Sequence, residues 1–232
     1  MHSKTNSFPR TGGAAGIGFA ALILLLNLLV LVPAGLPSPG SGLADAVAFF
    51  GTGPAAVDLG SMFLPAVWIL ATVFAAAAVA AAREAEHART EAWALVGFAG
   101  VLLQNLNVAT VSAIRLALAH TEAQDAAAAL WAFHEALFGL NGTFLATALV
   151  GLSLSGRRAG LIPAWLAFTG FTAAGLQFAS AVLTPFMMDG TDSLGLIGLT
   201  GWLLWVAWLA AYGVFLLRKP TADPPHSEPI PS

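Results

Sequence analysis

The sequence predicts an all-α, polytopic membrane protein with six transmembrane helices and both termini in the cytoplasm (N-in/C-in). Three observations predict this class. Of the 232 residues, 58% are hydrophobic and 9% are charged, and the mean hydropathy is +0.81, well above that of a soluble domain. The apolar residues form long stretches, each near the 20 or so residues that a helix needs to cross the hydrocarbon core. All but one of the Lys and Arg side chains lie outside these stretches.

The apolar stretches define the expected elements in chain order. Residues 1–15 are polar and glycine-rich, and 220–232 contain five prolines, so both segments are expected to be disordered cytoplasmic tails. Between them, 16–219 is predicted to be a single transmembrane domain, because the spans leave no room for a soluble one. The six spans are 16–34, 59–82, 92–119, 128–155, 161–184 and 194–217.

The longest connection between spans is the extracytoplasmic loop 35–57. Its beginning is rich in proline and glycine, which excludes a helix there. Residues 41–50 can form a short amphipathic helix that lays Val47, Phe49 and Phe50 on an apolar surface. Two interpretations stay open, an anchor at the membrane interface and a lid over a pocket.

The distribution of positive charge sets the expected orientation. With both termini inside, every cytoplasmic segment carries two Lys or Arg residues and every extracytoplasmic segment carries none, as expected for a multi-pass protein of a bacterial-type cytoplasmic membrane. A cleaved signal peptide is the alternative interpretation of the first span, and the length of its apolar stretch argues against it. The eight residues that set the orientation are Lys4, Arg10, Arg83, Arg89, Arg157, Arg158, Arg218 and Lys219.

Several functional classes are excluded by composition. The net charge of −3 and the lack of a basic patch argue against a nucleic-acid partner. The absence of cysteine excludes disulfides and thiolate metal sites, and we expect no metal and no cofactor. A haem between helices needs paired, buried imidazoles, whereas His120 is predicted at a helix end and only His134 lies within a span.

Arg115 is the exception to the charge pattern, because it lies inside the third span. An Arg near the bilayer centre costs at least about 2.5–3.5 kcal/mol unless it is paired or hydrated. Gln104 lies within about 20° of Arg115 on a helical projection, and Asn105, Asn107 and Ser112 flank it. Such a stripe either joins helices by hydrogen bonds or lines a pocket, and the arginine favours the pocket.

The fourth span carries a second polar face. Trp131, Glu135 and Phe138 share one side of this helix, and His134 and Asn141 share the adjacent side. Glu135 is the only acidic residue deep inside a span. It is therefore the natural counter-charge for the third span.

The two spans are expected to form a hairpin through the turn 120–127. Arg115 and Glu135 are each ten residues from Asp125, a candidate helix cap, so they should lie at a similar depth and form an ion pair. This pair is either a structural bridge or the centre of a site in which His134 transfers protons. Asp58, at the start of the second span, and Gln177, in the fifth, are candidates for the wall of the same site.

The last two-fifths of the chain resemble a known family. The resemblance rests on WAFHEALF at 131–138, GRRAGLIPAWL at 156–166 and GLTGWLLWVAW at 198–208, and it covers 131–219. These segments are similar to those of a bacterial family of six-helix membrane proteins catalogued as a domain of unknown function. The resemblance implies a fold and a topology, without an activity.

Three classes of function follow from this pattern. In the first, a membrane-embedded enzyme similar to small terpene cyclases uses an acid to start a reaction of an isoprenoid-like substrate in an aromatic pocket. In the second the protein is a small transporter, and in the third it is a subunit of a membrane complex; a homo-oligomer is compatible with each. The expected ligand is a lipophilic small molecule or a lipid. The candidate catalytic residues are Glu135, Asp58 and His134, and the candidate substrate-binding residues are Arg115, Gln104, Asn107, Trp131, Phe138, Asn141 and Gln177.

Overall fold

The computed structural model describes residues 7–38, 40–52, 54–188 and 194–218. This part of the chain is helical and contains no strand. Six of its helices are long and apolar enough to cross a membrane, so the predicted all-α, six-span class is confirmed. The orientation of the termini stays a prediction.

The helices follow the predicted spans, with some differences at their ends. A π-helical turn extends the first helix, and a short helix lies in the loop predicted at 35–57. In chain order the elements are α1 (Phe8–Leu26), η1 (Asn27–Leu31), α2 (Leu43–Thr52), α3 (Pro54–His87), α4 (Trp93–Ala119), α5 (Gln124–Arg158), α6 (Ala164–Val182), α7 (Thr184–Met188) and α8 (Gly195–Arg218).

The first helix begins well inside the predicted tail 1–15. Pro9 stands in its first turn, where a missing N–H is harmless, and the helix continues through Gly12 and Gly13. These glycines allow close contact with α3 and α8, so residues 8–15 are part of a packed helix, whereas residues 1–6 lie outside the described residues. The predicted tail 220–232 lies outside the described residues.

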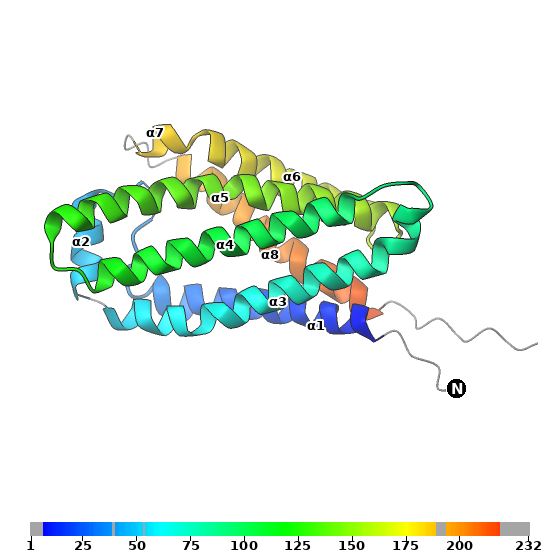
Figure 1. Cartoon of the computed structure of the whole chain (residues 1–232), viewed down its shortest axis with the longest axis horizontal. Helices are drawn as coiled ribbons and strands as arrows, with labels where there is room; N and C mark the ends of the chain where they lie inside the picture. The colour runs from blue at the N-terminus through cyan, green and yellow to red at the C-terminus, as the bar shows by residue number, and fades with distance from the viewer. Residues whose placement is uncertain (1–6, 39, 53, 189–193, 219–232) are drawn as a thin grey trace, which may run out of the picture.

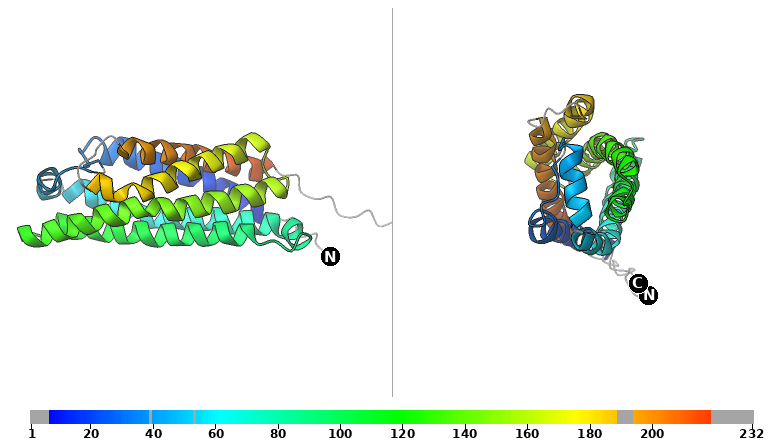
Figure 2. Two further views of the ribbon diagram at one scale, coloured as in Figure 1. Left: turned by 90° about the horizontal axis from the view of Figure 1, so that it is seen from above. Right: turned by 90° about the vertical axis from the view of Figure 1, so that its left-hand side faces the viewer.

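The six long helices form a closed ring in the order α1, α3, α4, α5, α6 and α8. Each helix packs against the next, and α8 returns to α1 (Figure 1 and Figure 2, right). The short helix α2 lies across one end of this ring, which we call the outer end. The N-terminus of α1 and the C-terminus of α8 lie at the opposite, inner end.

Aromatic side chains fill the inner half of the ring. Phe74 of α3 meets Tyr212 of α8 edge to face, with ring centroids 5.4 Å apart, and Trp208 makes a similar contact with Tyr212 at 5.3 Å. Leu149 of α5 is fully buried in the same cluster. This close-packed core fixes the positions of the helices that carry the polar residues of the outer half.

The orientation can be tested in the native background, because the chain has no cysteine. Ala123 precedes α5 at the outer end and Ala88 lies in the α3–α4 turn at the inner end, and both are exposed. In intact cells we expect an impermeant maleimide to label Ala123→Cys and not Ala88→Cys, which should react only after permeabilisation. The reverse labelling pattern would contradict the N-in/C-in topology.

Candidate functional site

The antiparallel contact between α4 and α5 brings a cation, an imidazole and a carboxylate together. The Nε–H of Arg115 donates to Nε2 of His134 at 2.9 Å, and Nδ1 of His134 lies 3.1 Å from Oε1 of Glu135. The side chains of His134 and Glu135 are only 4% and 10% exposed, so water does not compete for these bonds. We call these three residues the Arg–His–Glu relay.

The direction of these bonds assigns the tautomer of His134. A guanidinium can only donate, so Nε2 must accept from Arg115. The proton of the neutral ring therefore lies on Nδ1, from which it is donated to Glu135. Both nitrogens of the imidazole are thus engaged, and the ring connects the two charges without carrying one itself.

The predicted direct ion pair between Arg115 and Glu135 is wrong. The pairs within salt-bridge distance in the described ranges are His120–Asp58, His134–Glu135 and Arg158–Glu91. The depth of the two residues follows the expected register, but His134 projects between them. An imidazole in this position satisfies both groups through hydrogen bonds, which removes the need for a direct contact.

The loop before α2 is bonded to the same part of α5. The backbone N–H of Gly40 donates to Oε2 of Glu135 at 2.7 Å, and Nε1 of Trp131 donates to the carbonyl of Ser41 at 3.2 Å. Gly40 has φ of +87°, a conformation that favours glycine. We call these two bonds the loop latch.

The helix that follows the loop completes a cover over the outer end. Ala46, Phe49 and Phe50 of α2 are buried in a cluster with Trp131, and the Phe50 and Trp131 rings lie 6.2 Å apart. These contacts support the lid interpretation of the amphipathic segment over a simple interfacial anchor. Figure 2 (right) shows α2 lying over the end of the ring.

An aromatic stack holds the imidazole in place. The rings of Trp131 and His134 are stacked at 4.7 Å with an interplanar angle of 12°, and His134 and Phe138 at 5.9 Å with 8°. Cζ of Arg115 lies 5.6 Å from the centroid of Phe138, within the range of a cation–π contact. The relay is therefore fixed by packing as well as by hydrogen bonds.

Phe138, at the end of this stack, is not fully covered by the rest of the protein. Phe138, Leu145 and Leu149 are two and three turns apart on one face of α5, and they are 38%, 3% and 0% exposed. Since Leu149 lies in the core, this face points into the ring, whereas Leu140 points outward. The uncovered part of Phe138 therefore lies on the face of α5 that points into the ring, and we call the space beside it the outer chamber.

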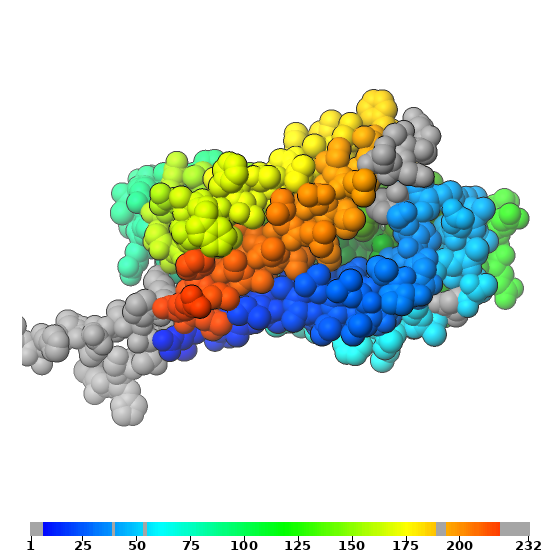
Figure 3. Space-filling model, turned by 180° about the vertical axis from the view of Figure 1, so that it is seen from behind, coloured from blue at the N-terminus to red at the C-terminus, as the bar shows by residue number. Residues whose placement is uncertain are grey.

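The opposite wall of the outer chamber comes from α4. Val108 and Arg115 are seven residues apart on the face that also carries Val101 and Gln104, and both are half-buried. Figure 3 shows the surface hollowed between α8 (orange) and the segment from α1 to α2 (blue), with green atoms from the α4–α5 part of the chain visible inside. The hollow lies on the side of the bundle, the face that a bilayer would cover.

The guanidinium of Arg115 has a free edge. Its Nε is bonded to His134, but its two Nη groups have no hydrogen-bond partner in the described ranges. They are also not among the fully enclosed, unpartnered polar atoms. Two donors that point away from the relay are thus available to a further acceptor.

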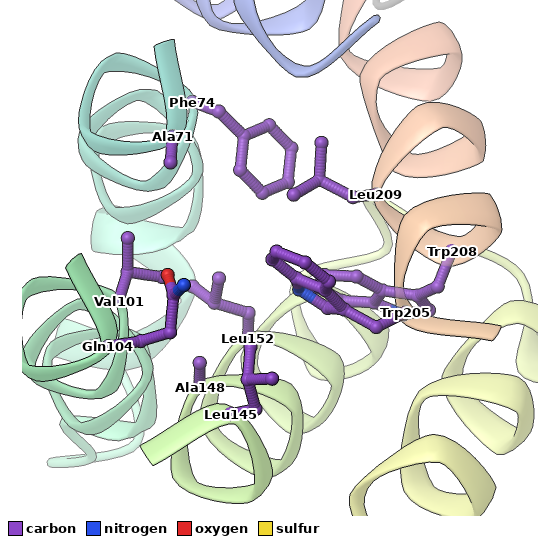
Figure 4. Close-up of a pocket in the computed structure, with 10 residues that line it drawn as sticks. All are labelled: Ala71, Phe74, Val101, Gln104, Leu145, Ala148, Leu152, Trp205, Trp208 and Leu209. Carbon is purple, nitrogen blue, oxygen red and sulfur yellow. The ribbon is translucent and has the colours of Figure 1, made fainter. Parts of the chain in front are cut away.

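The remaining polar residues of α4 have separate roles. Asn107 donates from Nδ2 to the carbonyl of Leu137 at 3.0 Å and to Oδ1 of Asn141 at 3.2 Å, which ties α4 to α5. Gln104 lines a deeper cavity of about 10 Å³ opposite the indoles of Trp205 and Trp208 (Figure 4). This volume holds about one water molecule, so the cavity is too small for a substrate.

Two predicted site residues do not join the relay. Asp58 is bonded to His120 at 3.3 Å in an exposed pair that links the outer ends of α3 and α4. Gln177 donates to the carbonyl of Gly198 at 3.0 Å and so ties α6 to α8. Both residues therefore join neighbouring helices. Asp58 lies near the start of α3, and Gln177 lies beside Gly198 of α8.

Sequence reasoning missed the loop latch. Its groups are the backbone N–H of Gly40 and the backbone carbonyl of Ser41, and backbone atoms leave no signature in residue type. The high glycine content of the loop was the available signal, since a positive φ at Gly40 is what aims its N–H at Glu135.

Comparison with known proteins assigns neither a family nor a function to this chain. No family model, no curated protein and no solved structure matches the chain. The resemblance at 131–219 therefore remains an expectation about the fold, and the geometry of the site is the basis for a proposed function.

Proposed function

We propose that this protein binds a lipophilic molecule in the outer chamber, within a bacterial-type cytoplasmic membrane, and that binding without a chemical step is its molecular activity. One observation carries the proposal: His134 holds Arg115 through Nε, while the Nη groups have no partner among the described residues and the inward face of Phe138 beside them is 38% exposed. An oriented, half-buried cation with free donors is a typical anchor of a ligand site. The hollow in Figure 3 offers a route from the side of the bundle.

An acid-initiated reaction of the terpene-cyclase type finds less support. A general acid must present its proton to the substrate. Glu135 accepts N–H bonds from Gly40 and His134, an arrangement that suits the ionised carboxylate, and both ring nitrogens of His134 are engaged. Asp58 is paired with His120 at the surface. We therefore assign Glu135 and His134 to the positioning of Arg115.

The choice between a ligand-binding protein, such as a transporter, and a subunit of a membrane complex without a ligand depends on the interior of the ring. A passive subunit needs a packed centre, as in the inner half, where Phe74 and Leu149 are fully buried. The exposed, inward-facing surface of Phe138 favours a ligand-binding protein. Movement of the ligand across the membrane is a separate step for which the closed inner half offers no path.

The proposal can be tested by filling the outer chamber. After purification of the full chain in mild detergent, retained lipophilic molecules are identified by mass spectrometry. Val108→Trp places an indole in the chamber, so we expect it to remove the retained molecule. Leu106→Trp is the matched control, because Leu106 is 66% exposed on the outer side of the same helix. Equal retention in the wild type and both variants, or none in any of them, would contradict the proposed function.

A further inference from the structure

We infer that the ligand of the outer chamber is an amphiphile with an oxyanion headgroup, a carboxylate or a phosphate, bound by the two Nη groups of Arg115. This inference rests on the proposed function and deepens it. The structure contributes four arguments: the free donor geometry of Arg115, its fixed orientation, the apolar wall beside it and the charge around the outer end.

The donor geometry fits two acceptor oxygens. With Nε occupied by His134, the end of the guanidinium that remains presents one N–H from each Nη in parallel. Carboxylates and phosphates accept such a pair in a bidentate manner, and these charge-assisted bonds are about twice as strong as neutral ones. A ketone or an alcohol offers one oxygen and leaves a donor unpaired.

The orientation of the guanidinium is set before any ligand arrives. His134 fixes Nε, Glu135 fixes His134, and the Gly40 N–H fixes Glu135. Phe138 covers the guanidinium from one side at 5.6 Å. A site ordered in this way loses little entropy on binding, which favours a compact charged headgroup over a diffuse polar one.

The surroundings favour an amphiphile over a free anion. The connections at the outer end contain no Lys or Arg, and the carboxylates of Asp45, Glu122 and Asp125 lie there. This negative potential repels a small anion that approaches from water. An amphiphile in the bilayer can enter sideways, with its chain against Phe138 and Val108 and its headgroup at Arg115.

The test uses the full-length protein in nanodiscs and three photoreactive probes. The probes carry the same chain of about sixteen carbons, which is roughly as long as one bilayer leaflet is thick. Their headgroups are a carboxylate, a phosphate and an alcohol, and labelling is measured by intact mass and mapped by peptide. We expect the two anionic probes to label the chamber face of α5 about tenfold or more above the alcohol. Millimolar acetate or inorganic phosphate, which lack a chain, should not compete.

Variants of Arg115 separate charge from geometry. Arg115→Gln should reduce labelling by the anionic probes to the level of the alcohol, and Arg115→Lys should fall between, since it keeps the charge and loses the fork. Leu106→Gln, on the outer side of α4, is the control. If Arg115→Gln does not fold, the ratio among the three probes on the wild type decides alone.

Equal labelling by the alcohol and the acids overturns the headgroup inference and leaves the proposed function standing. Competition by acetate or phosphate overturns the amphiphile and indicates a free anion. Absence of labelling by all three probes, together with no retained lipophile in the purified protein, overturns the proposed function as well.

Discussion

Replacing Glu135 by Leu is expected to destabilise the fold by about 3–5 kcal/mol, because it leaves the guanidinium of Arg115 without its counter-charge in a low-dielectric interior. It also leaves the N–H of Gly40 and Nδ1–H of His134 without their acceptor. Arg115→Leu should have a similar effect, because it leaves the carboxylate of Glu135 without its counter-charge. Unfolding of the purified protein in detergent, monitored by heat or denaturant, measures these losses.

The double variant Arg115→Leu/Glu135→Leu should lose less stability than the sum of the two single losses, since no lone charge remains. His134→Leu tests the relay itself, because it removes the group through which the two charges are connected. Asp58→Asn is the control: its pair with His120 is exposed and should be worth about 0–1 kcal/mol. Additive losses at Arg115 and Glu135 would mean that the imidazole does not couple them.

The spans could be predicted from the sequence because the bilayer sets their length. Hydropathy located all six, and the ends differ where local packing decides. The first helix extends to Phe8 because glycines on its face allow close contact with α3 and α8, an effect that depends on the neighbouring helices and not on hydropathy.

The depth of the site could also be predicted, but its bonding could not. Counting residues from the α4–α5 turn placed Arg115 and Glu135 at the same level, because a helix rises by a fixed distance per residue. Which side chain fills the gap depends on helix rotation and side-chain rotamers. His134 was therefore expected beside the pair and lies between its members.

For helix α2 too, the sequence predicts the helix but not the surface that it covers. An amphipathic pattern predicted a helix near 41–50, and α2 occupies Leu43–Thr52. The pattern left open what its apolar face covers, since a membrane interface and a protein surface both bury phenylalanine. The contact of Phe50 with Trp131, and the bonds of the preceding loop to α5, depend on tertiary structure.

Gly151→Ala is expected to destabilise the protein by about 1–3 kcal/mol, because it overpacks the contact on which the site depends. A Cβ at this position of α5 would lie 2.6 Å from Cα of Gly97 and 2.7 Å from the carbonyl oxygen of Trp93 in α4. These are backbone atoms, so the clash can be relieved only by moving one helix away from the other.

That movement should also weaken the bond between Arg115 and His134, which spans the same pair of helices. The matched control is Gly175→Ala in α6, where an added Cβ meets nothing within 4 Å. Alanine there should stabilise by about 0.5–1 kcal/mol, since glycine is unfavourable inside a helix. The two variants make the same chemical change and are expected to shift the unfolding midpoint in opposite directions, with binding of the anionic amphiphile reduced only in Gly151→Ala. A neutral effect of Gly151→Ala would show that α4 and α5 tolerate separation, and that the relay does not depend on their close approach.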